Sequence, residues 1–178
     1  MNPIFDNSTI DAFFADNAQN EPTWIGNVFQ VATNREVIPF TFERIRYLMI
    51  LGAPIYEAGD EESFLNLSSA WADGFSPKDQ SRVMKFCRAD AVDEHFQPDR
   101  WKLLNPLSIY SFCQTVTAVV EHYVESCPDV EQFFFWPTTS QLETFYKRVF
   151  RHLNRGCLNG QFVPILEPLG VFNGYQKP

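Results

Sequence analysis

The chain has 178 residues, a formal net charge of −8 and charged side chains at 20% of its positions. This length predicts one domain, 1–178, with a core large enough to stand without disulfides or metals. The acidic balance argues against broad electrostatic binding to nucleic acid, and no apolar run approaches the roughly 18 residues of a membrane span. Residues 1–12 lack the basic and apolar segments of a secretory signal, so we expect a cytoplasmic protein.

The first 22 residues hold four acidic residues and neither lysine nor arginine. Ser8 and Asp11 are spaced to cap a short helix that carries Phe13 and Phe14 on one face. Such an acidic, aromatic arm is typical either of a docked N-terminal helix or of a detachable segment that binds a partner. We therefore treat 1–22 as a candidate docking arm and both phenylalanines as candidate partner-binding residues.

Five elements are expected between this arm and residue 90. The segments 24–33 and 36–41 are predicted to be extended, the second held by a proline. Three helices are predicted to follow, because apolar residues recur at helical spacing and glycine or proline punctuates the ends. These helices cover 42–51, 60–74 and 76–90.

The second half of the chain is predicted to contain the longest helix. A polar connection, 90–101, precedes this helix, which spans 107–126 between two prolines. The stretch 129–136 (D-V-E-Q-F-F-F-W) reads as one helical turn or as a buried strand, because periodicity cannot separate the two in a short apolar run. Residues 157–178 are predicted to form an extended C-terminal tail, with a first extended piece at 161–168.

The strongest helical signal lies at 139–155. Its apolar residues fall at i, i+3, i+4, i+7 and i+11 on one face, and hydroxyl residues precede it as caps. The opposite face carries a basic stripe, which either complements the helix dipole or docks an anionic partner. The candidate partner-binding residues on this stripe are Lys147, Arg148, Arg151 and Arg155.

No motif in the sequence predicts catalysis. The four cysteines are widely spaced, the three histidines lie far from one another, and glycine-rich phosphate-binding motifs are absent. We therefore predict no catalytic residues, no metal, no cofactor and no enzyme activity. The cysteines, interpreted as small buried apolar side chains in a reducing compartment, are Cys87, Cys113, Cys127 and Cys157.

The expected fold is therefore mainly α: a single compact multi-helix domain with a few short strands or extended segments. Its pattern across 38–153 resembles small helical proteins of tailed-phage morphogenesis, loosely the tail-assembly-chaperone-like kind. The pattern consists of P-F-T at 39–41 with a helix to Leu51, a second helix through Leu67 and Trp71, and later helices at 107–126 and 131–153. This resemblance implies a non-catalytic assembly or virion-associated protein in the host cytoplasm or virion. Its partners would be copies of itself or phage structural proteins.

The C-terminal half is also similar to that of acetyltransferase-like proteins. The similarity rests on the order helix 107–126, strand 131–136, helix 140–155 and strand 161–167, with Tyr146 on the second helix. It implies an α+β fold and, in an active member, Tyr146 as a proton donor. The family's Q/R-x-x-G-x-G/A loop, which binds the pyrophosphate of coenzyme A, is absent here, so an enzyme and a degenerate relative both stay open.

We predict a non-catalytic protein that works through protein–protein interaction or assembly, without membrane contact. The acetyltransferase-like enzyme or its degenerate relative is the first alternative. A second alternative is an inhibitor whose acidic segments 6–21 and 90–94 mimic nucleic acid when they bind a basic protein.

Overall fold

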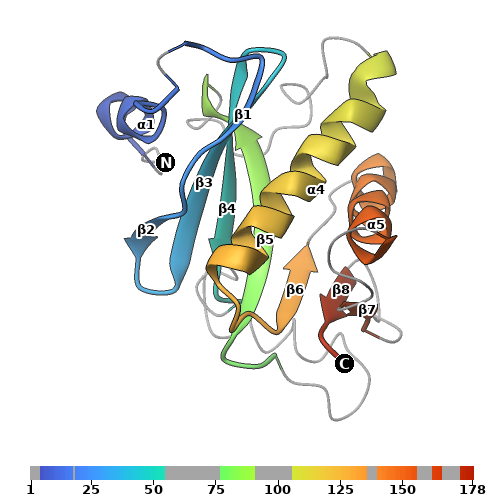
Figure 1. Ribbon diagram of the computed structural model, residues 1–178. Coiled ribbons are helices and arrows are strands. Elements are labelled where there is room, and N and C mark those ends of the chain that lie inside the picture. The colour runs from blue at the N-terminus through green and yellow to red at the C-terminus, as the bar shows by residue number, and fades with distance from the viewer. Residues whose placement is uncertain are drawn as a thin grey trace.

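The computed structural model in Figure 1 describes residues 5–17, 19–54, 77–90, 106–135, 140–155, 162–165 and 173–178. These residues form an α+β fold in which helices cover a mixed β-sheet. The strands are β1 (Thr23–Ile25), β2 (Phe29–Ala32), β3 (Arg35–Phe42), β4 (Ile45–Gly52), β5 (Ser81–Arg88), β6 (Gln132–Phe135), β7 (Val163–Pro164) and β8 (Asn173–Gln176). The helices are α1 (Asn7–Phe13), α4 (Ile109–Ser126) and α5 (Ser140–Arg155), and the 3₁₀ turn η3 (Pro106–Ser108) leads into α4.

The eight described strands belong to one sheet with the order β1-β3-β4-β5-β6-β8-β7, and β2 also pairs with β3. The described pairs are antiparallel except for β5 and β6, which run parallel. A parallel pair needs a crossover connection, usually a helix. Here the crossover contains α4, which runs diagonally across the sheet in Figure 1.

The sheet overturns the expectation of a mainly α, helical protein. The predicted helix 42–51 is a strand, β4, with its first residue at the end of β3, and the predicted helix 76–90 contains β5. Six consecutive residues of β4 are buried, as are six of the eight residues of β5. Strands covered on both faces read as continuous apolar runs, which periodicity alone does not distinguish from a buried helix.

The same correction affects the resemblance to phage assembly proteins, because the segment that it treats as its first helix is β4. The predicted helix 60–74 and nearly all of the connection 90–101 lie outside the described residues. The helices predicted at 107–126 and 139–155 are confirmed as α4 and α5.

The extended segments are also confirmed, and two open points are settled by the sheet. The pieces predicted at 24–33 and 36–41 form β1, β2 and most of β3. The ambiguous stretch 129–136 contains a strand, β6, in which all four residues are buried. Two parts of the tail 157–178 join the sheet as β7 and β8.

The helices bury different faces of the sheet. On one face α4 and α5 pack over alternate residues of the central strands, such as Phe40 and Met49. On the other face α1 packs over Val37, Leu48 and Ile50. Successive side chains of a strand point to opposite faces, and this alternation lets the same strands supply both cores.

Helix α1 is docked on its face of the sheet. The backbone N–H of Thr9 donates to the Asp6 carboxylate at 2.7 Å, which caps the helix and lowers the pKa of Asp6. Asp11, predicted to take part in the cap, instead forms an ion pair with Arg46 at 2.8 Å. This pair joins α1 to β4 and corrects the predicted cap.

The hairpin between β3 and β4 turns through two residues with left-handed backbone. Phe42 pairs with Ile45, so the turn consists of Glu43 and Arg44, whose φ angles are 53° and 63°. Hairpin turns of this type favour Asn-Gly, because a Cβ atom is crowded at positive φ. The hydroxyl of Ser108 donates to the Glu43 carboxylate at 2.5 Å and joins the turn to the start of α4.

Replacing Arg44 with glycine is expected to raise the free energy of unfolding by roughly 0.5–1 kcal/mol. The left-handed conformation costs a residue with a Cβ atom roughly 1–2 kcal/mol, and the greater unfolded-state freedom of glycine offsets part of the gain. Urea unfolding followed by circular dichroism measures the change. Arg44→Ala is the matched control, since it loses the same side chain and keeps the Cβ atom. Equal stability of the two variants would contradict backbone strain at this position.

Candidate functional site

The parallel strands β5 and β6 pair through the first three residues of each strand. Residues 81–83 lie opposite 132–134, and β5 then continues to Arg88 while paired with β4. Ligands of sheets with parallel strands bind beyond the carboxyl ends, where neighbouring connections leave in different directions. The place where the carboxyl ends of β5 and β6 part is therefore the first candidate site.

Aromatic side chains fill this place. Tyr146 of α5 stacks on Phe135 at the end of β6, with 4.4 Å between the ring centroids, and meets Phe86 of β5 edge-on at 5.8 Å. The exposed fractions of Tyr146, Phe135 and Phe86 are 3%, 1% and 3%. We call these three residues the aromatic wedge. Burial raises the pKa of Tyr146 above its ordinary value, so its phenol stays protonated.

The sequence that connects β5 to α4 does not suit the pyrophosphate of a coenzyme A thioester. Residues 89–108, which connect β5 to α4, contain no glycine. A phosphate-binding turn of this kind uses glycine so that backbone N–H groups can approach the anion closely. Arg88, at the end of β5, is already bound to the Asp90 carboxylate, to which its Nε donates at 2.9 Å. Neither the sequence of this connection nor Arg88, the described cation at the end of β5, therefore fits such a ligand.

A buried ion pair lies nearer the start of β5. Arg82 Nε donates to Glu36 Oε2 of β3 at 3.0 Å, and the hydroxyl of Tyr123 in α4 donates to the same oxygen at 3.3 Å. The side chains of Arg82 and Glu36 are only 10% and 11% exposed. Burial and the nearby Glu36 charge raise the pKa of Tyr123, so its hydroxyl remains a donor to the carboxylate. The network joins β3, β5 and α4.

Sequence reasoning missed this network. Glu36 opens a segment predicted only to be extended, and Arg82 falls within a segment predicted to be helical. The available signal was the presence of charged residues beside apolar ones in both segments, since a buried charge is normally paired. The sequence does not show that Glu36 and Arg82 are partners, because they pair across an intervening strand, β4.

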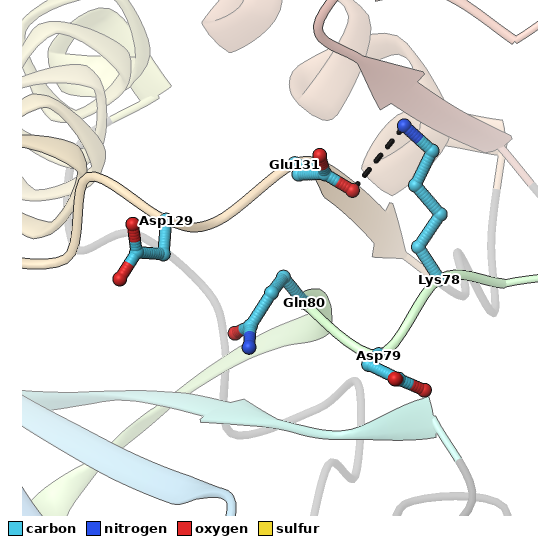
Figure 2. Close-up of a pocket in the computed structure, with 5 residues that line it drawn as sticks. All are labelled: Lys78, Asp79, Gln80, Asp129 and Glu131. Atoms are coloured by element: carbon cyan, nitrogen blue, oxygen red, sulfur yellow. Dashed lines mark ion pairs between the residues drawn. The ribbon is translucent and has the colours of Figure 1, made fainter.

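An open depression lies just before β5 and β6 begin, at the other end of these strands from the aromatic wedge (Figure 2). Its volume is about 650 Å³, and it is lined by Lys78, Asp79, Gln80, Asp129 and Glu131. Lys78 and Glu131 form an ion pair at 3.2 Å, whereas Asp79 and Asp129 point away from that pair in Figure 2. Three carboxylates and one ammonium leave the depression with an excess of two negative charges.

Gln132, the first residue of β6, holds the loop that precedes β5. Its side chain is 1% exposed, and its amide oxygen accepts from the backbone N–H of Lys78 at 2.9 Å and from the Ser81 hydroxyl at 2.5 Å. Its amide nitrogen donates to Gln176 of β8 at 3.2 Å. The start of β5 is thus held against β6 and β8 by one buried amide.

The basic stripe predicted on α5 faces solvent. Its exposed members are Lys147, Arg148 and Arg151. Lys147 forms an ion pair with Glu143 one turn earlier, as predicted from the i, i+4 spacing. Arg155 is the last residue of α5, and its side chain lies outside what the structure describes.

Two exposed apolar residues lie where η3 leads into α4. Leu107 is 87% exposed and Tyr110 is 57% exposed. The ring of Tyr110 meets that of His152 in α5 edge-on at 5.6 Å between centroids. This contact brings an aromatic residue of α4 to the helix that carries the basic stripe.

The candidate partner-binding phenylalanines of the N-terminal arm lie in the interior. Phe13 and Phe14 are 6% and 3% exposed. Phe13 packs on Phe29 at 5.1 Å and Phe14 on Trp24 at 5.9 Å between ring centroids. Of the two forms expected for the arm, the structure contains the docked helix, and a partner could reach these rings only by displacing α1.

The described thiols and imidazoles are not grouped into a reactive site. Cys87 and Cys113 are buried, and burial raises the pKa of both thiols, that of Cys87 to about 12. His122 Nε2 is buried and has no hydrogen-bond partner among the described residues. In the same part of the chain, no three His, Cys, Asp or Glu residues are placed to hold a metal ion. Cys157 and His95 lie outside the described residues.

Comparison with known proteins returns no match to the chain, whether among family models, curated proteins or solved structures. Within the described ranges, none of the helices combines the length and apolar character that crossing a membrane requires. Function must therefore be inferred from the geometry and chemistry of the sites above.

Proposed function

We propose that the chain is a degenerate relative of acetyltransferase-like enzymes, which keeps their fold, lacks their chemistry and acts by binding another protein. The order α4, β6, α5, β7 supports the fold, because it repeats the helix–strand–helix–strand order of that family's C-terminal half. The main observation behind the proposed loss of acetyl transfer is the aromatic wedge.

Acetyl transfer would require open space at the aromatic wedge. A thioester and an attacking amine must both come within hydrogen-bond reach of the proton donor. Tyr146 has the protonation state of a donor, but its ring lies against Phe135 and Phe86 and is 3% exposed. The glycine-free connection 89–108 is a second obstacle, because it does not suit a pyrophosphate.

Because these features disfavour acetyl transfer, we propose that the protein acts by binding a partner through its surface. The side chains of Arg148 and Arg151 are exposed on α5, and Tyr110 is exposed against His152 of the same helix. Tyrosine and arginine are enriched among the residues that contribute most to protein interfaces. A surface of this composition supports the predicted role in protein–protein interaction.

Thermal unfolding with and without acetyl-CoA tests the loss of chemistry. We expect the melting temperature to stay unchanged up to millimolar acetyl-CoA, because a ligand that does not bind the folded state cannot stabilise it. Tyr146→Phe is expected to retain the wedge packing and to melt within a few degrees of the wild type. Coenzyme A and adenosine diphosphate, measured alongside, separate binding of the acyl arm from binding of phosphate.

Binding of acetyl-CoA would contradict the proposal. A saturable rise in melting temperature with acetyl-CoA would show that the wedge opens to admit the thioester. If acetylation of an amine then depended on the Tyr146 hydroxyl, so that Tyr146→Phe lost it, the protein would be an enzyme and the proposal would be wrong.

A further inference from the structure

Two exposed surfaces of opposite charge carry side chains that form no ion pair with a described residue. The first is the basic face of α5, which we define by Arg148 and Arg151. Both side chains are exposed, and neither forms an ion pair with a described residue. The chain as a whole carries 22 acidic against 14 basic residues, so a basic face of this kind is a local exception to its surface charge.

The second surface is the acidic depression lined by residues 78–80, Asp129 and Glu131. Lys78 neutralises Glu131, with which it pairs at 3.2 Å. Asp79 and Asp129 are exposed and form no ion pair with a described residue. In Figure 2 the side chains of Asp79 and Asp129 lie on either side of Gln80, and their carboxylates do not face each other.

We infer that these two surfaces bind each other between copies of the chain. Arg148 and Arg151 of one copy enter the depression of the next and donate to the carboxylates of Asp79 and Asp129. Arginine suits this role, because its planar guanidinium pairs with a carboxylate through two parallel hydrogen bonds. The volume of about 650 Å³ leaves room for both side chains in the open depression.

A contact between two different surfaces leaves one free basic face and one free depression at the ends of every assembly. The contact is therefore heterologous, and it continues to grow unless the copies close into a ring. Because the paired groups lie at the surface, salt weakens their attraction. The inference rests on the protein binding proposed above, and its partner is a second copy of the same chain. It is independent of whether a thioester enters the wedge.

Sedimentation velocity of the full chain at about 100 µM tests the contact. In 50 mM salt we expect species heavier than the monomer, and in 500 mM salt a return towards the monomer. Two neutralised variants, Arg148→Gln/Arg151→Gln and Asp79→Asn/Asp129→Asn, are each expected to be monomeric in 50 mM salt. Circular dichroism and melting temperature confirm that both variants remain folded, since all four side chains are exposed.

Mixing the two variants gives the sharpest result. One variant keeps its depression and the other keeps its basic face, so an equimolar mixture can form a single contact and then stop. We expect a dimer with one copy of each variant and nothing larger. A wild-type chain that is monomeric in 50 mM salt would overturn the inference, as would a mixture that stays monomeric or a neutralised variant that still associates. None of these outcomes depends on acetyl-CoA, whose binding is scored separately.

Discussion

Replacing Arg82 with methionine is expected to lower the free energy of unfolding by about 3–5 kcal/mol, the usual cost of removing one partner of a buried ion pair. The variant would leave the Glu36 carboxylate in the sheet with the Tyr123 hydroxyl, at 3.3 Å, as its remaining side-chain donor. One hydroxyl does not replace the charge and the two donors of the guanidinium. Urea unfolding of the variant and the wild type measures the loss.

The double variant Glu36→Leu/Arg82→Met is the matched control. It removes both charges and leaves no unpaired ion in the interior, so it is expected to be more stable than Arg82→Met alone. With Glu36→Leu measured as the second single variant, the double-mutant cycle reports the coupling between the two residues. If the losses of unfolding free energy in the two single variants added up to the loss in the double variant, the two residues would not be coupled. The description of a buried network would then be wrong.

Replacing Phe135 with alanine is expected to cost about 3–5 kcal/mol, as truncation of a buried aromatic side chain does. Phe135 is 1% exposed and joins three elements. Its ring stacks on Tyr146 and Phe150 of α5, at 4.4 and 5.8 Å, and on Tyr175 of β8 at 6.2 Å. The cavity would therefore open between the sheet and α5. Chemical unfolding followed by near-ultraviolet circular dichroism detects both the loss of stability and the loss of aromatic packing.

Phe135→Leu distinguishes volume from mere apolar character. Leucine keeps most of the buried apolar volume, so the expected loss is about 1–1.5 kcal/mol. If leucine and alanine cost the same, the surrounding rings would be able to close around the gap. The aromatic wedge would then be a pliable region that could also open for a ligand, and the proposed loss of chemistry would lose its main support.

The elements that were predicted correctly are those whose pattern is local. Helices α4 and α5 each bury one face and expose the other, so their apolar residues repeat with the helical period and can be recognised without any partner. The basic stripe follows from the same period, because the residues opposite a buried helical face must be exposed. The end of the long helix is also local, since a proline follows it closely.

The strands β4 and β5 were predicted as helices for a physical reason. A strand in the middle of a sheet that is covered on both faces shows no alternation, and its nearly continuous apolar residues also occupy the positions of a helical face. Met49 and Ile50 are both buried, one under α4 and α5 and the other under α1. Met49 and Ile50 are both apolar because helices bury both faces of the sheet. Those helices come from distant parts of the chain.

The candidate sites divide in the same way. Tyr146 could be placed on a helix from the sequence, but its position between Phe86 and Phe135 depends on residues that are brought together by the fold. The ion pair of Glu36 and Arg82 spans 46 residues of sequence, and the bond from Tyr123 to Glu36 spans 87. No local spacing rule applies at such separations.

The sequence by itself determined the two long helices, their buried and basic faces, and the lack of a glycine-rich phosphate loop, because each depends on neighbours within a few residues. The tertiary structure alone decided that the centre of the protein is a sheet and that Tyr146 is enclosed. It also decided that an acidic depression lies where the parallel strands begin. These features depend on which faces are covered and which strands are neighbours, and burial and pairing of that kind are properties of the whole chain.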